Sequence, residues 1–183
     1  MPMPESNCDW PQRMNQNHHE ALSQLVGLPV LKIGRAADLL WIHFGSWRDI
    51  PARNGGTKMV GDWALHILAP WRIVKDQTIL VGDMDMYRYF EDGTQFDWEA
   101  DGESRFDRIA DTLNMALKTS SQTVEKLSTD GLGGFSLGTD QDVSLDVFSN
   151  ASLGFPENEL WRLFQPARET EHFVVETLGG QEN

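Results

Sequence analysis

A single amphipathic helix between two groups of short alternating segments constrains this fold more than any other feature of the chain. Apolar residues recur with a helical period after Ser104, which stands where an N-cap is expected, and Asp107 lies in the first turn, where the helix dipole favours negative charge. The apolar positions are Phe106, Ile109, Leu113, Ala116 and Leu117. We therefore predict a helix over residues 104–118 that packs one face against a sheet.

The segments on either side of this helix favour strands. Apolar and polar residues alternate in 60–69, 123–127 and 143–147. Further strand candidates are 71–74 and 78–82, which would form a hairpin that turns at 75–77, together with 135–137, 159–164 and 172–177. Residues 36–44 are apolar on both faces, which predicts a strand covered on both sides, and 45–58 contains the turn residues typical of a loop. The predicted class is α+β, a mostly antiparallel or mixed sheet with an N-terminal helix and one central amphipathic helix.

The ends of the chain define the expected domain. We predict a flexible leader over residues 1–16, a single α+β domain over 17–178 and a frayed C-terminus over 179–183. Asn17 is predicted to cap a helix, because Glu20 follows three positions later and completes a capping box. The start of the chain has no secretion signal, and Cys8 is the single cysteine, so no intramolecular disulfide forms. We therefore expect a cytoplasmic protein.

The net charge of −13 limits the possible partners. Nucleic acid and anionic membrane surfaces both need clustered Lys and Arg, so neither is expected to bind. A basic protein partner or a cation would suit this charge better. Solubility alone is also a sufficient reason for an acidic surface.

One acidic stretch is the first candidate for a binding site. Residues 76–111 hold eleven Asp or Glu and three Arg. A tryptophan among carboxylates is typical of an anchor for a basic partner, which predicts association weakened by salt and lost in Trp98→Ala. A cation site is the alternative, although the spacing does not fit a calcium-binding EF-hand loop. The candidate partner-binding residues are Asp83, Asp85, Asp97, Trp98, Glu99 and Asp101.

Two histidines are the second candidate. His43 and His66 fall in predicted strands and would share a sheet face if those strands pair. With Asp38 or Asp62 they would form an acid–base pair, and with Asp83 and Asp85 they are candidate metal ligands. The alternative is a pair of hydrogen-bonded histidines on a half-buried sheet face.

Nucleophilic catalysis has little support in the sequence. Residues 134–138 fit the pattern G-x-S-x-G around Ser136, but a strand-like segment follows where a nucleophile elbow requires a helix. We therefore interpret this segment as a strand flanked by glycines.

Two pairs of segments suggest a resemblance. Residues 63–67 with 70–73, and 160–164 with 172–175, are similar to patterns in small uncharacterised bacterial proteins and, more loosely, to the strand-rich immunity proteins that neutralise toxins. The resemblance implies a bacterial, cytoplasmic, non-enzymatic domain and carries no functional residue to this chain.

The leading hypothesis is a non-catalytic, cofactor-free protein-interaction domain that binds a basic partner through its acidic face. The alternative is a small metal- or ligand-binding domain, or an enzyme, using His43, His66 and nearby carboxylates. Self-association into a homo-oligomer through sheet edges stays open as a third hypothesis.

Overall fold

The computed structural model describes residues 10–52, 55–89, 97, 102–150, 159–168 and 170–177, with side chains from residue 17 onward. Strands predominate, and the elements run in the order α1 (Trp10–Ser23), β1 (Pro29–Ala36), β2 (Leu39–Phe44), β3 (Arg48–Pro51), β4 (Thr57–Val60), β5 (Trp63–Ile67), β6 (Trp71–Lys75), β7 (Thr78–Gly82), the 3-10 helix η1 (Asp83–Tyr87), α2 (Arg105–Thr119), β8 (Gln122–Thr129), β9 (Phe135–Thr139), β10 (Val143–Val147), β11 (Glu159–Phe164) and β12 (Phe173–Glu176).

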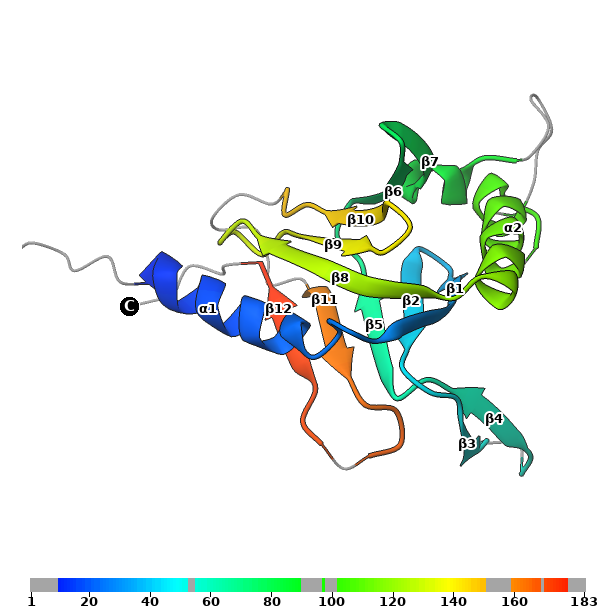
Figure 1. Ribbon diagram of the computed structural model, residues 1–183, viewed down its shortest axis with the longest axis horizontal. Helices are drawn as coiled ribbons and strands as arrows, with labels where there is room; N and C mark the ends of the chain where they lie inside the picture. The colour runs from blue at the N-terminus through cyan, green and yellow to red at the C-terminus, as the bar shows by residue number, and fades with distance from the viewer. Residues whose placement is uncertain are drawn as a thin grey trace, which may run out of the picture.

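One large antiparallel sheet contains ten of these strands, in the order β12-β11-β5-β2-β1-β8-β9-β10-β6-β7. The predicted α+β class is therefore correct at the level of one antiparallel sheet with two helices. The sheet has two halves, because β1 and β8 pair only at Pro29 with Thr123 and at Val30 with Gln122. Beyond these two pairs the halves diverge. In the view of Figure 1, α1 and α2 lie toward opposite ends of β8, and the β3–β4 hairpin projects away from the sheet.

The two halves share one hydrophobic core. Phe135 on β9 meets the fully buried Trp161 on β11 edge to face, with ring centroids 5.2 Å apart. The Trp161 indole N–H donates to the carbonyl oxygen of Gly133 at 2.7 Å, so its polar atom is satisfied inside the core. On the α2 side, Trp71 meets Phe106 with ring centroids 5.7 Å apart. The first contact joins two strands that the sheet order separates, and the second joins β6 to helix α2.

Helix α2 forms as its sequence predicts. The Ser104 hydroxyl accepts a hydrogen bond from the Asp107 backbone N–H, and the Asp107 carboxylate accepts one in return from the Ser104 backbone N–H. This reciprocal capping box satisfies two backbone donors that a helix start otherwise leaves free. The predicted apolar face is confirmed in part: Phe106 is buried and Ile109, Leu113 and Leu117 are half-buried, but Ala116 is exposed. Ala110, which the pattern did not include, is buried in its place.

Two polar contacts fasten α2 to β1 at the place where β1 has left β8. Arg35 forms a two-pronged ion pair with Asp107, with Nε–Oδ1 2.9 Å and Nη2–Oδ2 2.8 Å. About two turns further along α2, the side chain of Asn114 makes two hydrogen bonds, each 2.9 Å long, with the backbone of Ile33. The helix thereby closes the gap between the two halves of the sheet.

Helix α1 begins earlier than the sequence predicts. It starts at Trp10, with Pro11 in its first turn, where proline is favoured, so Asn17 lies inside the helix and does not cap it. Helix α1 ends at Ser23, and the turn that follows it ends at Gly27, which adopts a positive φ of 85°. The buried Leu22 and Leu25 fasten this end of the chain to the core.

The region between α1 and β5 differs most from the sequence-based expectation. Residues 36–44 were predicted as one strand covered on both faces, but the chain turns at Ala37, whose φ is 53°, and β1 and β2 form a hairpin. Strand β2 buries alternate residues only, because its second face lies in a pocket. The expected loop 45–58 contains strand β3 and the start of β4, which pair as a second hairpin. Among the described residues no helix is both long and apolar enough to cross a membrane.

Candidate ligand-binding pocket

The outer face of strands β1, β2 and β5 forms the floor of the largest described pocket. Along β2, the side chains of Leu40, Ile42 and Phe44 enter the core, so the alternate residues project to the opposite face. These alternate residues are Leu39, Trp41 and His43, and all three line the pocket. The pocket holds about 1040 Å³, at the upper end of the roughly 300–1,000 Å³ typical of small-molecule sites.

Helix α2 and the β3–β4 hairpin supply the walls. The helix contributes its polar face, and the hairpin contributes Lys58 and Met59. Three large apolar side chains of the lining are exposed: Trp47 by 40%, Met59 by 56% and Met115 by 61%. Exposed methionines and aromatics beside a cavity are typical of binding surfaces, because they offer adaptable apolar contact. The helix residues of the lining are Asp111, Asn114, Met115 and Lys118.

Trp41 lies flat across β1 because the residue opposite it has no side chain. Gly34 pairs with Trp41, and a Cβ atom at Gly34 would lie only 2.2 Å from Cζ2 of the indole. The ammonium of Lys32, two residues before Gly34, sits 5.7 Å from the Trp41 ring centroid, within the range of a cation–π contact. The floor of the pocket therefore contains an indole ring with the ammonium group of Lys32 next to it.

His43 is fixed by its neighbours. The backbone N–H of Gly61 donates to Nδ1 of His43 at 2.8 Å. The imidazole meets Trp41 edge to face at 5.3 Å between centroids, and Trp47 at 6.0 Å with a tilt of 32°. Burial lowers the pKa of His43 to about 4, assisted by the positive charges of Lys58 and Lys32 and by His66. The ring is therefore neutral at pH 7.

His66 lies diagonally from His43 on the same sheet face. The pairing of β2 with β5 places Ala64 opposite His43 and His66 opposite Trp41, as the sequence predicted for paired strands. Burial and the charge of Arg162 lower the pKa of His66 to about 4, although Glu159 opposes this effect. The ring meets Phe164 edge to face at 4.8 Å between centroids. The described structure thus brings both predicted histidines into one aromatic pocket.

The turn that carries Trp47 is braced by Asp62. The Asp62 carboxylate accepts a hydrogen bond from the backbone N–H of Ser46 at 2.8 Å and pairs with Nε of Arg48 at 2.9 Å. Arg48 also donates to the carbonyl oxygen of Pro166 at 3.1 Å. Asp62 therefore holds the pocket wall in place rather than pairing with His43, and Asp38 is exposed in the β1–β2 turn.

Positive charge is concentrated in this pocket, although the chain as a whole is acidic. The chain has five lysines, and three of them line the pocket: Lys32, Lys58 and Lys118. Among the described residues of the lining, Asp111 is the one carboxylate. These lysines and the two tryptophans Trp41 and Trp47 were not predicted as site residues, because they come from β1, β2, β4, α2 and a turn. The scarcity of lysine and the Trp41-x-His43 alternation were the available signals.

The predicted acidic residues lie elsewhere. Asp83 and Asp85 belong to η1, where Asp85 accepts a hydrogen bond from the backbone N–H of Gly82 and pairs with Arg105. No group of three or more His, Cys, Asp or Glu that would hold a metal occurs among the described residues, so the structure does not gather Asp83 and Asp85 with His43 and His66. Asp97 is exposed, and Trp98, Glu99 and Asp101 lie outside the described residues. Docking of a basic partner here stays a prediction.

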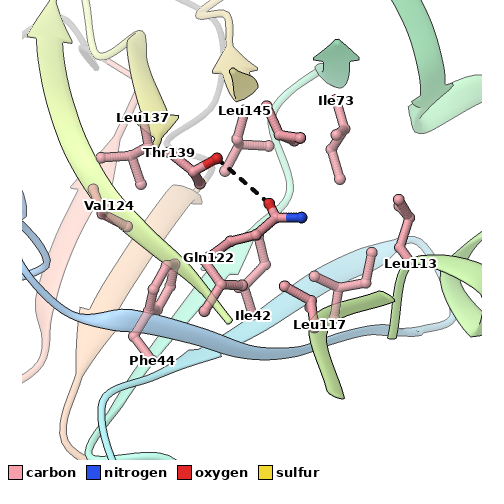
Figure 2. Close-up of a pocket in the computed structure, with 13 residues that line it drawn as sticks. Ile42, Phe44, Ile73, Leu113, Leu117, Gln122, Val124, Leu137, Thr139 and Leu145 are labelled. Atoms are coloured by element: carbon pink, nitrogen blue, oxygen red, sulfur yellow. Dashed lines mark hydrogen bonds between the residues drawn. The ribbon is translucent and has the colours of Figure 1, made fainter. Parts of the chain in front are cut away.

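A second, smaller cavity lies on the other face of α2. It holds about 60 Å³ inside the core and is lined mainly by aliphatic side chains, including Leu113 and Leu117 of the helix (Figure 2). Gln122 extends into it, with its Oε1 3.4 Å from the Thr139 hydroxyl. A cavity of about 60 Å³ lies far below the roughly 300–1,000 Å³ typical of small-molecule sites, so we treat it as a packing gap.

Comparison with known proteins gives no match: no family model fits the chain, and no curated protein or solved structure is similar to it at a significant level. The case for a function therefore depends on the geometry of the larger pocket.

Proposed function

We propose that this protein is a ligand-binding domain whose pocket takes a small anionic molecule with a flat aromatic ring. The observation that carries the proposal is that three of the chain's five lysines line the pocket, one of them beside the Trp41 indole on its floor. Lysine ammonium groups attract carboxylate or phosphate as point charges, and an indole face offers a stacking surface for a planar ring. Both kinds of contact converge on one cavity.

The state of the histidines favours binding over acid–base catalysis. A pKa of about 4 makes His43 and His66 weak bases at pH 7, whereas an efficient general base has a pKa close to the working pH. In a catalytic triad, Nδ1–H of the histidine donates to a carboxylate. In this pocket Nδ1 of His43 accepts from a backbone N–H instead.

The same hydrogen bond makes His43 a poor metal ligand. A histidine that binds a metal through one ring nitrogen almost always donates a hydrogen bond from the other. Because Nδ1 of His43 accepts a hydrogen bond from the backbone N–H of Gly61, the one N–H proton of the neutral ring is on Nε2. Nε2 then has no lone pair to offer, so we assign a binding role to His43 and no metal to the pocket.

The test uses 2-naphthoate and its neutral analogue 2-naphthamide, measured by isothermal titration calorimetry and by shifts of the tryptophan indole NMR signals. We expect naphthoate to bind several-fold more tightly than the amide and to lose affinity as salt rises. Lys32→Gln, Lys58→Gln and Lys118→Gln should each weaken naphthoate binding by about two- to fivefold, the equivalent of about 0.5–1 kcal/mol for an exposed ion pair.

Matched controls come from the two lysines outside the pocket. Lys75→Gln and Lys126→Gln change the net charge by the same amount but leave the lining intact. If these two variants weaken naphthoate binding as much as the pocket variants, the effect is one of total charge and the proposed site is wrong. Equal binding of naphthoate and naphthamide would also contradict the proposal.

A further inference from the structure

We propose that His43 sets the ligand specificity of this pocket by donating a hydrogen bond from Nε2–H to an acceptor atom in the ligand's aromatic ring. The inference rests on the proposed function and narrows the ligand class to heteroaromatic acids. In such molecules the anionic group meets the lysines, and a ring nitrogen or ring carbonyl meets His43.

The proton position of His43 follows from its backbone partner. An amide N–H can only donate, so Nδ1 of His43 must be the acceptor in its 2.8 Å contact with Gly61. A neutral imidazole with Nδ1 as acceptor carries its proton on Nε2. Gly61 approaches His43 this closely because it has no side chain. A Cβ at this position would lie 2.7 Å from the carbonyl oxygen of Phe44 and 3.0 Å from Cβ of His43.

The Nε2–H of His43 is available to a ligand. Among the described residues, Nε2 of His43 is not one of the buried side-chain atoms that lack a hydrogen-bond partner. His43 lines the pocket, and its one hydrogen bond is made through Nδ1. Nε2 is therefore accessible from the cavity.

The donor is also rigid. The contacts with Trp41 and Trp47 flank the imidazole, and the bond from Gly61 sets its rotation. A fixed donor discriminates better than a mobile one, because a ligand without an acceptor leaves the N–H unpaired inside the complex. Since the ring is neutral, its selectivity is for an acceptor atom rather than for additional negative charge.

His66 provides the internal comparison. It lies on the same face, lines the same pocket and has a similarly lowered pKa, but among the described residues no backbone N–H donates to either of its ring nitrogens. His66 contacts Phe164 through its ring only. No described neighbour therefore selects which ring nitrogen of His66 carries the N–H proton. We expect His66 to contact a ligand by packing rather than by a hydrogen bond of fixed direction.

The experiment has two independent measurements. The first is ¹⁵N NMR of the imidazole nitrogens in the ligand-free wild type at pH 7, which should show His43 with its proton on Nε2 and an unprotonated Nδ1. The second compares 2-naphthoate with a set of quinoline and isoquinoline carboxylates of the same shape, in which the ring nitrogen occupies each position in turn.

We expect one of these isomers to bind up to about tenfold more tightly than 2-naphthoate, which corresponds to one net hydrogen bond. His43→Phe should abolish that preference, so that no isomer binds more tightly than naphthoate, whereas His66→Phe should keep the preference. Both results together would support the assignment of His43.

Either of two outcomes would overturn the inference about His43 alone. A proton on Nδ1 of His43, or binding of every isomer within twofold of naphthoate, would remove the role of His43 while leaving the proposed function intact. Failure of naphthoate and all the isomers to bind would instead overturn the proposed function, and the inference about His43 with it.

Discussion

The side-chain amide of Asn114 pairs with the backbone of Ile33 as a neighbouring strand would. Its Oδ1 accepts from the Ile33 N–H and its Nδ2 donates to the Ile33 carbonyl oxygen, both at 2.9 Å. Ile33 lies in the part of β1 that β8 does not reach, where an unpaired backbone would otherwise meet the helix. One side chain on α2 therefore extends the hydrogen bonding of the sheet and fixes a pocket wall relative to the floor.

Loss of this amide should destabilise the protein. Asn114→Ala leaves the N–H and the carbonyl of Ile33 without their partner, so we expect the free energy of unfolding to fall by about 2 kcal/mol in urea titrations. Asn114→Asp should be no better, because its second oxygen would face the Ile33 carbonyl. Met115→Ala, an exposed neighbour on the same helix, is the control. An effect of Asn114→Ala no larger than that of Met115→Ala would show that the pairing adds nothing.

The Arg35–Asp107 pair should make stability depend on acid. Burial raises the pKa of Asp107, but hydrogen bonds from Arg35 and Ser104 outweigh this effect and hold it below the ordinary 3.8. A lowered carboxyl pKa contributes stability that is complete above pH 4 and is lost as pH falls through the folded-state value. Asp107→Asn should therefore cost about 3 kcal/mol at pH 7 and less at pH 3, because the guanidinium of Arg35, 1% exposed at its side chain, loses the carboxylate that balances its charge.

The control for this pair is Asp111→Asn, an exposed carboxylate on the same helix. Its unfolding free energy should stay within about 0.5 kcal/mol of the wild type at pH 7. A constant difference between the wild type and Asp107→Asn from pH 7 to pH 3 would contradict the linkage.

Glycine at position 34 should be necessary for the pocket floor. Gly34→Ala places a methyl group in the space of the Trp41 indole and should rotate the ring off β1. We expect a changed near-ultraviolet circular dichroism spectrum and at least a fivefold loss of naphthoate affinity. Gly82→Ala is the control, because a Cβ there has its nearest atom at 3.5 Å and lies outside the pocket lining. An unchanged spectrum in Gly34→Ala would show that the indole does not depend on this contact.

The two pocket histidines should lower stability in mild acid. Their pKa values of about 4 lie below the ordinary 6.5, so the unfolded chain takes up protons first as the pH falls. Stability should therefore decrease between pH 6.5 and pH 4, and less steeply in the double variant His43→Gln/His66→Gln. NMR titration of the imidazole signals measures the pKa values directly, and values near 6.5 would refute this prediction.

Filling the small core cavity should stabilise the fold. Val124 is 1% exposed and lines the cavity, so Val124→Ile places a methylene in empty space and should raise the free energy of unfolding by about 0.5–1 kcal/mol. Val81→Ile is the matched control: Val81 is equally buried but does not line the cavity, and overpacking there should cost about 1 kcal/mol or more. Equal effects of the two substitutions would indicate that the cavity collapses in solution.

Local chemistry explains the parts of the fold that were predictable. The Ser104 and Asp107 capping box determines where α2 begins. The turn between β6 and β7 was also predicted, and Asp76 and Gln77 there adopt positive φ values of 49° and 62°. In both places the deciding interactions join residues close in the chain.

The prediction of a single strand over residues 36–44 was wrong, because the residue that turns the chain there is not a typical turn residue. Ala37 turns the chain between β1 and β2 with a positive φ, a conformation that sequence patterns associate with Gly, Asn or Asp. The second face of β2 was predicted to be covered because Leu39 and Trp41 are apolar. Whether an apolar side chain meets the core or an open pocket depends on the elements packed above it, and strand periodicity does not contain that information.

By itself, the sequence determined the central helix and most of the strands, because alternation, turn residues and caps act over a few neighbouring positions. Only the tertiary structure decided the pocket. Its three lysines, Lys32, Lys58 and Lys118, come from three different elements. Asn114 and Asp107 hold α2 against β1, and the β3–β4 hairpin contributes Lys58 to another wall of the same pocket. An acidic chain thus acquires a locally basic, aromatic cavity, because packing brings together charges that are widely spaced in the sequence.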